Sequence, residues 1–131
     1  MPFTIAINPS ANHAEVAIHG RISLAEARAL MKQLVASKGL APGPTGLVDT
    51  TDLNGVDLAG PDVRDIAELA ARADALWAGG RWAIAAPRPV VFGLARVYHA
   101  LRSGAPYEIG VFRTREEATS WLLGGAGPAL R

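Results

Sequence analysis

The sequence predicts an α/β domain with the element order β-β-α-β-α-β-α-β-α and a mixed, mostly parallel five-stranded sheet. Short runs of strand-forming residues alternate with apolar stripes at helical spacing, which is the pattern of βαβ units. The first two strand-like runs are separated by a turn alone, so the first strand should be an antiparallel, edge-type strand. A chain of 131 residues fits one domain, predicted over 1–125, with 126–131 as a disordered tail.

The chain begins with a predicted hairpin and a capped helix. Residues 3–7 and 14–18 alternate apolar and polar positions and flank a turn-forming segment. Ser23 and Glu26 form a capping-box pattern, in which each side chain can bond to the other residue's backbone N–H. Apolar residues then recur at helical spacing until Gly39, which predicts an amphipathic helix.

A short strand and a loop are predicted in the middle of the chain. The proline- and glycine-rich segment 41–46 can continue neither a helix nor a strand interior. Leu47 and Val48 then belong to a short apolar strand that is predicted to start a residue or two earlier and to end at Asp49 or Thr50. The turn-forming composition of 52–57 predicts a loop after it.

The C-terminal half repeats the alternation of helix and strand. A helix over 61–76 has proline in its first turn and an apolar stripe. A buried strand over 81–86 precedes a helix over 90–103, and a fifth strand over 107–112 follows. A second capping-box pattern opens the last helix, over 114–122.

Composition excludes several classes of site. The net charge is +1 and no run of like charge occurs, which argues against a nucleic-acid partner. Cysteine is absent, so disulfides, thiolate metal sites and cysteine nucleophiles are excluded. Neither a signal-peptide pattern nor an apolar run of ~20 residues is present, and we expect a cytoplasmic protein with no membrane span. Nucleotide-binding motifs are also absent, so no cofactor is predicted.

Polar residues follow the predicted parallel strands, where ligand sites of α/β sheets gather. Asp49 and Asp52 follow the third strand, but the aspartates there do not have calcium-loop spacing, and no metal site is predicted. His19 and Arg88 follow the second and fourth strands. An enzyme using Asp49, Asp52, His19 or Arg88 is one hypothesis, although no catalytic motif supports it.

A second group of polar residues lies around the fourth predicted helix. Arg88 precedes this helix, and Arg96 and His99 are one turn apart on it. These residues could contact an anion or an acidic partner. A solvated helix face is the alternative interpretation.

Three segments resemble one protein family. The family is that of the SpoIIAA-like domains of the STAS superfamily, specifically the STAS/SEC14 group. Its third strand and loop resemble LVDTTDLNGVD, and its fourth strand and helix resemble AIAAPRPVVFGLARVYHAL. Its closing segment resembles FRTREEATSWL. The resemblance implies a small sheet with helices mainly over one face, and a regulatory or protein-interaction role without catalysis.

The chain departs from this family at the position of the phosphorylatable serine. Phosphoswitch STAS domains resemble one another in an Asp-Ser-Ser-Gly-type motif, whereas this chain has Asp57-Leu58-Ala59-Gly60. Leucine and alanine cannot accept phosphate, so a serine switch is not expected. Thr50 and Thr51 are the nearest hydroxyl residues.

The first functional hypothesis is a non-enzymatic STAS-like module that binds a protein partner or a second copy of itself. Its predicted interaction loop comprises Asp49, Thr50, Thr51, Asp52, Leu53, Val56 and Leu58. A binder of a small apolar or lipid-like ligand is the second hypothesis, although a chain of this length leaves little interior space once its core is filled. An enzyme of unknown reaction is the third.

Overall fold

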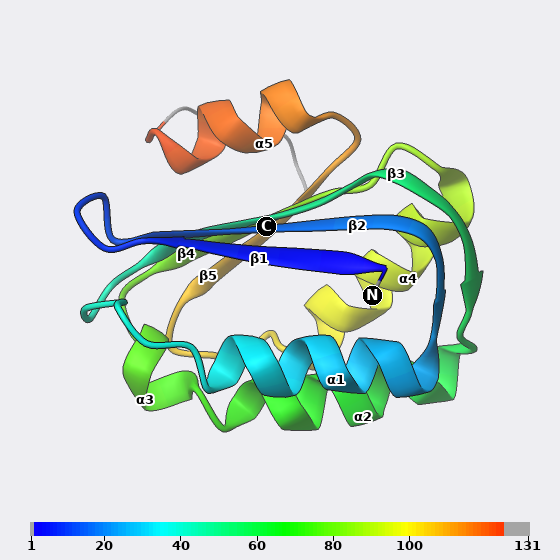
Figure 1. Ribbon diagram of the computed structural model, residues 1–131, viewed down its shortest axis with the longest axis horizontal. Coiled ribbons are helices and arrows are strands. Elements are labelled where there is room, and N and C mark those ends of the chain that lie inside the picture. The colour runs from blue at the N-terminus through cyan, green and yellow to red at the C-terminus, as the bar shows by residue number, and fades with distance from the viewer. Residues whose placement is uncertain (1, 125–131) are drawn as a thin grey trace.

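The structure is a computed structural model that describes residues 2–124, and its strands form one five-stranded sheet in the order β1-β2-β3-β4-β5 (Figure 1). β1 pairs antiparallel with β2, and every other neighbouring pair is parallel. The predicted fold class is therefore confirmed, whereas the predicted tail over 126–131 lies outside the described residues. The strands are β1 (Phe3–Asn8), β2 (His13–Ser23), β3 (Thr45–Asp57), β4 (Arg81–Ala85) and β5 (Glu108–Phe112).

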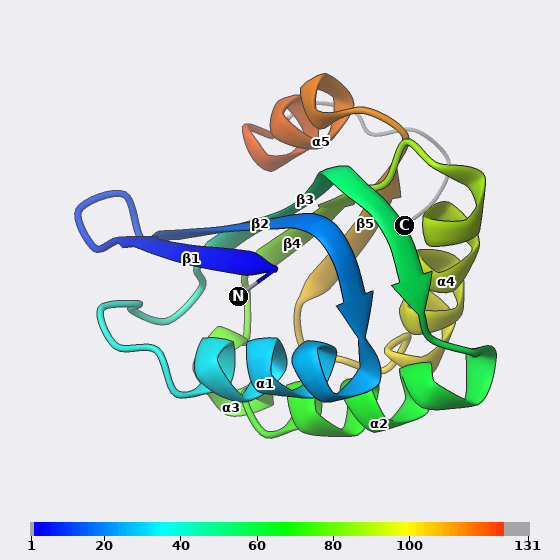
Figure 2. The same cartoon turned by 45° about the vertical axis from the view of Figure 1, so that its right-hand side comes forward.

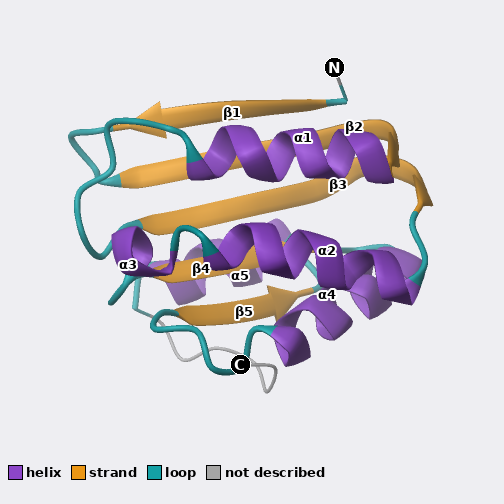
Figure 3. Ribbon diagram, turned by 90° about the horizontal axis from the view of Figure 1, so that it is seen from below, coloured by secondary structure: helices purple, strands orange, loops and turns teal. Residues whose placement is uncertain are grey.

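Helices cover the sheet unequally. Among the described residues, α1, α2, α3 and α4 lie over one face and α5 lies over the other (Figures 1 and 2). Seen from the helix side, α1 lies nearest β1 and β2, while α4 lies toward β5 with α2 between them (Figure 3). The helices are α1 (Leu24–Val35), α2 (Gly60–Ala71), α3 (Asp74–Trp77), α4 (Pro89–Leu101) and α5 (Arg115–Leu122).

Side-chain caps fix where three helices begin. Ser23 Oγ accepts from the Glu26 N–H at 3.2 Å, and Glu26 Oε1 accepts from the Ser23 N–H at 2.9 Å, so the predicted capping box is confirmed. Thr114 Oγ1 accepts from the backbone of α5 in the same way. At α2, Asp62 accepts from the Ala59 N–H at 2.9 Å. Each cap satisfies a backbone donor that has no partner within the helix.

The predicted loop over 52–57 was wrong, because β3 continues through it to Asp57. β2 is also longer than expected, and the two strands remain parallel neighbours as far as Ser23 and Asp57. Register shifts interrupt the pairing on either side of Gly20, whose φ is 69°. Extra residues at such irregularities break the regular alternation of side chains, which removes the pattern by which a strand is recognised in sequence.

The predicted helix over 61–76 is divided into α2 and α3. Ala73, at the break, is completely buried. The short second helix brings Trp77 against Trp82 of β4, with ring centroids 4.4 Å apart. Tertiary packing of the two indole rings thus accompanies a break that helical periodicity did not indicate.

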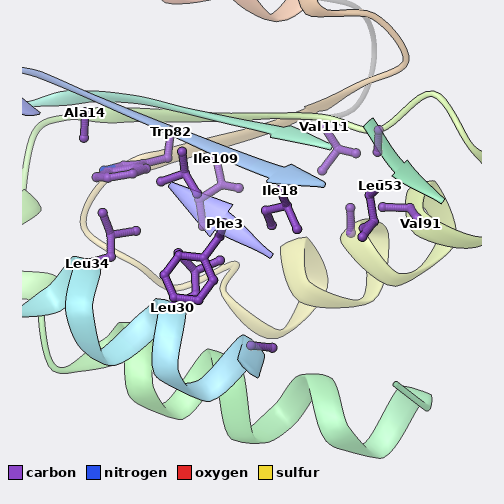
Figure 4. Close-up of a cluster of buried hydrophobic side chains, with 14 of the residues drawn as sticks. Phe3, Ala14, Ile18, Leu30, Leu34, Leu53, Trp82, Val91, Ile109 and Val111 are labelled. Carbon is purple, nitrogen blue, oxygen red and sulfur yellow. The ribbon is translucent and has the colours of Figure 1, made fainter. Parts of the chain in front are cut away.

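Two apolar cores lie on opposite faces of the sheet. In the larger one, strand side chains such as Ile18 and Ile109 point toward helix residues such as Leu30 and Val91 (Figure 4). The smaller core lies under α5 and is centred on Trp121, which is fully buried. α5 therefore closes only part of its face, over β3, β4 and β5.

Candidate functional site

The larger core contains a cavity of about 170 Å³ between the sheet and the helices of its main face. β2, β3, β4 and β5 form its roof, and α1, α2, α3 and α4 contribute to its walls and floor. The lining is almost entirely aliphatic and aromatic. A void of this kind is unusual, because protein interiors are packed about as densely as organic crystals.

Two residues on interior strands show that this space is accessible. Val48 of β3 and Ile84 of β4 line the cavity and are only partly buried, although each of these strands has a neighbour on both sides. Val48 and Ile84 are register partners in the parallel pairing of β3 with β4. Since both side chains pack against the core on the helix side of the sheet, the part of their surface that stays accessible to solvent faces the cavity.

Small side chains help to explain why the space is not filled. Ala27 of α1 and Ala95 of α4 both line the cavity and are themselves buried. A methyl group at such a position leaves volume that a leucine or isoleucine would occupy. The cavity is therefore encoded by small residues where two helices face the sheet.

Most of the cavity wall offers no free polar group. Thr50 is buried and lines the cavity, but its hydroxyl donates to the Ala85 carbonyl at 2.7 Å. This bond satisfies a buried hydroxyl that would otherwise be costly. The wall near Thr50 can therefore contact a ligand only through apolar surface.

Two tyrosines contribute to the lining of the cavity, and one of them contacts a charged pair. Tyr98 and Tyr107 both line it. Arg102 Nη2 donates to the Tyr107 hydroxyl at 3.2 Å and pairs with Asp74, while the Arg102 side chain is only 9% exposed. Burial raises the pKa of both tyrosine hydroxyls, so they remain protonated near neutral pH.

The apolar residues of the predicted interaction loop lie against the cavity. Leu53 is only 2% exposed, and Val56 and Leu58 are partly buried; all three line the cavity. Thr51 and Asp52 are exposed. The structure thus places the apolar residues of the predicted set inward, together with Thr50, and it leaves Thr51 and Asp52 exposed. All of the set except Leu58 lies on β3 instead of in a loop.

Asp49 lies on the opposite side of the sheet, toward α5. Its carboxylate accepts from the Thr51 N–H at 2.9 Å and from Arg115 Nη1 at 2.9 Å. Burial raises the pKa of Asp49, but the bonds from Thr51 and Arg115 outweigh burial and hold it below its usual value. Arg115 also donates to Glu15 of β2. An ionised carboxylate held in this way stabilises the fold and is poorly suited to be a general base.

The remaining predicted contact residues do not form one site. Arg88 is exposed at the start of α4, and Arg96 is exposed further along this helix. His99 is partly buried. Within residues 2–124, no side-chain hydrogen bond or ion pair joins these three residues. His19 lies opposite Asp52 in the pairing of β2 with β3.

Two kinds of feature are absent from the described residues. Among residues 2–124, no three histidine, aspartate or glutamate side chains form a group that could hold a metal ion. Across the same residues, no helix combines the length and apolarity required to cross a bilayer.

Sequence reasoning missed the cavity and most of its lining. Trp82 lies in the core and Tyr98 packs against it, as expected of large aromatic residues, but no pattern in the sequence predicted the space beside them. The signal available in the sequence was the alanine content of the helices at core-facing positions. That signal is weak because the same residues also suit close helix packing.

Known proteins show which architecture this chain shares. No family model and no curated protein matches the chain. A solved structure of an uncharacterised protein of the DUF3478 family from Shewanella loihica PV-4, described as having a SpoIIAA-like fold, is 21% identical to this chain. The match covers 92% of this chain and 93% of the other, with a TM-score of 0.58. The predicted resemblance is thus confirmed at the level of architecture: the chain has a SpoIIAA-like fold.

Proposed function

We propose that this protein binds a small apolar molecule in the cavity between its sheet and the helices of its main face. The observation that carries the proposal is the volume of about 170 Å³ with an almost wholly apolar lining. An engineered apolar cavity of about 150 Å³ in another protein takes up benzene, so the space suits a ligand of that size. Ligands in such sites gain affinity by removing apolar surface from water.

The position of the cavity favours binding over catalysis. Nearby titratable groups are engaged in pairs, with Arg102 bonded to Asp74 and Asp49 to Arg115 on the other face. Thr50 is likewise used in a bond to the backbone. An acid, a base and a nucleophile would have to converge on one point for most reactions, and the cavity wall does not supply them.

The interaction role predicted from the sequence stays a prediction. Leu53, which was expected to contact a partner, is 2% exposed. Val56 and Leu58 are partly buried against the cavity. These three residues support ligand binding better than they support a flat protein interface.

Toluene is a suitable first probe because it is apolar and matches the cavity in size. We expect wild-type protein to bind toluene with a dissociation constant of about 0.1–1 mM, which corresponds to about 4–5.5 kcal/mol. Chemical-shift changes should be confined to residues of the cavity, such as Val48 and Ile84, in a two-dimensional NMR titration. Saturable binding at these residues would support the proposal.

A filled cavity provides the test of location. Ile84→Phe adds volume at the cavity wall and should weaken toluene binding at least tenfold, since the ligand and the ring would compete for one space. Ile7→Phe is the matched control, because Ile7 is partly buried on β1 and is not part of the cavity lining. No toluene binding to the folded wild type, or equal weakening by both variants, would contradict the proposal.

A further inference from the structure

We infer that a second copy of this chain docks against the outer face of α4, so that the two α4 helices pack antiparallel around a two-fold axis. The inference is independent of ligand binding in the cavity and rests on the side chains that α4 exposes. α1 and α4 lie on opposite sides of the helical layer, with α2 between them (Figure 3). α4 is thus at a border of this layer, where another molecule can reach it.

The exposed side of α4 is almost wholly apolar, and Arg96 is its single polar member. Its exposed residues are Pro89, Val90, Gly93, Arg96, Val97, Ala100 and Leu101. Three of the five large apolar side chains that residues 2–124 expose belong to it, namely Val90 (67% exposed), Val97 (39%) and Leu101 (36%). α1 and α2, by contrast, expose charged residues such as Arg28 and Arg64. A helix that is apolar on nearly all sides is normally covered on all sides.

The apolar residues form one stripe along the helix. Val90, Gly93, Val97 and Ala100 are successively three, four and three residues apart, which is the spacing of seam residues between two helices packed side by side. The stripe is about three turns long, or roughly 15 Å. Arg96 lies about 100° around the helix from Val97, so it flanks the stripe and can stay in water.

The sizes of these residues favour a second copy as the occupant. In an antiparallel pair centred between Gly93 and Val97, each Val97 lies opposite Gly93 of the other copy. Val90 lies opposite Ala100 in the same register. Every layer then joins one valine to one small residue, which fills the space between the helices and lets their backbones approach closely. A Cβ at Gly93 would meet no atom within 4 Å in this chain, so the space there is open to a valine of the second copy.

The charges are compatible with the same arrangement. The stripe itself has no charged residue that could repel its own copy. Antiparallel packing sets the N-terminal end of each α4 beside the C-terminal end of the other, where the helix dipoles attract. Arg88, which is exposed at the N-terminal end, would lie near the last carbonyl groups of the other α4, and these favour a cation. Water and salt screen the repulsion between the two flanking Arg96 side chains.

A carboxylate in the stripe tests the interface without disturbing the fold of one chain. Gly93→Glu adds a side chain where the single chain leaves open space. It should weaken dimerisation at least tenfold, since two carboxylates would be enclosed by valines. Ala25→Glu is the matched control, because Ala25 is exposed on α1, at the other side of the helical layer.

Sedimentation equilibrium over a range of protein concentrations measures the dissociation constant of the dimer. We expect about 10–100 µM for the wild type and for Ala25→Glu, because a single pair of helices makes a small interface. Circular dichroism shows whether Gly93→Glu remains folded. Equal weakening by Gly93→Glu and Ala25→Glu would overturn the inference, and so would a wild type that stays monomeric at millimolar concentration.

Cysteine cross-linking tests the antiparallel register. The chain contains no cysteine, so Gly93→Cys and Val97→Cys each introduce a single thiol. An oxidised mixture of the two variants should form mainly the mixed disulfide, because residue 93 faces residue 97 of the other copy and a disulfide requires close Cα atoms. Preferential cross-linking of Gly93→Cys with itself would show that the antiparallel arrangement is wrong.

A lipid surface is the alternative occupant of the stripe. If the wild type stays monomeric but binds phosphatidylglycerol vesicles, and Gly93→Glu abolishes that binding, then α4 contacts lipid and the inferred dimer is wrong. Toluene enters none of these experiments, so the dimer and the proposed function can fail separately.

Discussion

The carboxylate of Asp49 on β3 accepts a hydrogen bond at 2.9 Å from Arg115 on α5, 66 residues later in the chain. The other terminal nitrogen of Arg115 donates to Glu15 of β2 at 2.9 Å. One guanidinium thus joins two neighbouring parallel strands to the only described helix on this face. The Asp49 side chain is 15% exposed and that of Arg115 is 43% exposed, so water screens the pair only in part.

Replacing Arg115 should make stability depend differently on pH. The folded-state pKa of Asp49 lies below its ordinary value of 3.8, so the resulting stabilisation is fully present above about pH 5 and is lost as the pH falls through the folded value. Arg115→Met should lower the free energy of unfolding by about 1 kcal/mol at pH 7, and by much less near pH 2. Urea unfolding across this pH range measures the difference.

Arg64→Met is the control for this experiment. Arg64 is exposed on α2 and forms no ion pair within residues 2–124. Its replacement should change stability by less than about 0.5 kcal/mol at either pH. A loss in Arg115→Met that is equally large at pH 2 and pH 7 would show that the lost stabilisation is not electrostatic.

Truncation of Leu53 tests whether the extended β3 is part of the core. Leu53→Ala should lower the free energy of unfolding by about 2–4 kcal/mol, because it removes buried surface and enlarges a void. Leu76→Ala, at a residue that is 61% exposed, should have an effect below about 0.5 kcal/mol. If both variants unfold like the wild type in denaturant, Leu53 cannot be a core residue.

Gly46 should not tolerate even a methyl group. A Cβ at this position would lie 2.1 Å from Cε3 of Trp82, so the indole ring would have to move. Gly46→Ala should therefore destabilise the protein by about 1–3 kcal/mol. In α4, a Cβ at Gly93 would meet no atom within 4 Å, and Gly93→Ala should stabilise by about 0.5–1 kcal/mol. We expect the two variants to shift the midpoint of thermal denaturation in opposite directions. Shifts in the same direction would contradict the packing of Gly46 against Trp82.

Adjacent threonines should respond differently to loss of the hydroxyl. Thr50→Val leaves the Ala85 carbonyl without its buried partner and should reduce the free energy of unfolding by about 1–2 kcal/mol. The Thr51 side chain is exposed and bonds to Asp49, so Thr51→Val should have less than half that effect. A larger loss in Thr51→Val than in Thr50→Val would contradict this assignment of burial.

The element order could be predicted from sequence because its signals are local. The Ser23 and Glu26 capping box lies within four residues, and the strand over 81–86 is apolar throughout. The second half of β3 could not be predicted in this way. It contains Asn54 and Gly55, which are typical of turns, and it forms a strand because β2 offers backbone partners beside it.

The candidate site was harder to predict than the fold. Leu53, Val56 and Leu58 were recognised as unusual apolar residues, but sequence alone does not tell whether such side chains point outward to a partner or inward to a void. The bond of Asp49 to Arg115 joins distant parts of the chain. Such relationships depend on the packing of whole layers, which no local pattern encodes.

The cavity also gives the molecule a mechanical property. Unfolding removes internal void volume, so the unfolded state of a protein with such a space occupies less volume than the folded state, and hydrostatic pressure favours unfolding. A ligand that fills the space would reduce this volume difference. We therefore expect the packing between the sheet and α1, α2 and α4 to be disrupted first when hydrostatic pressure is raised.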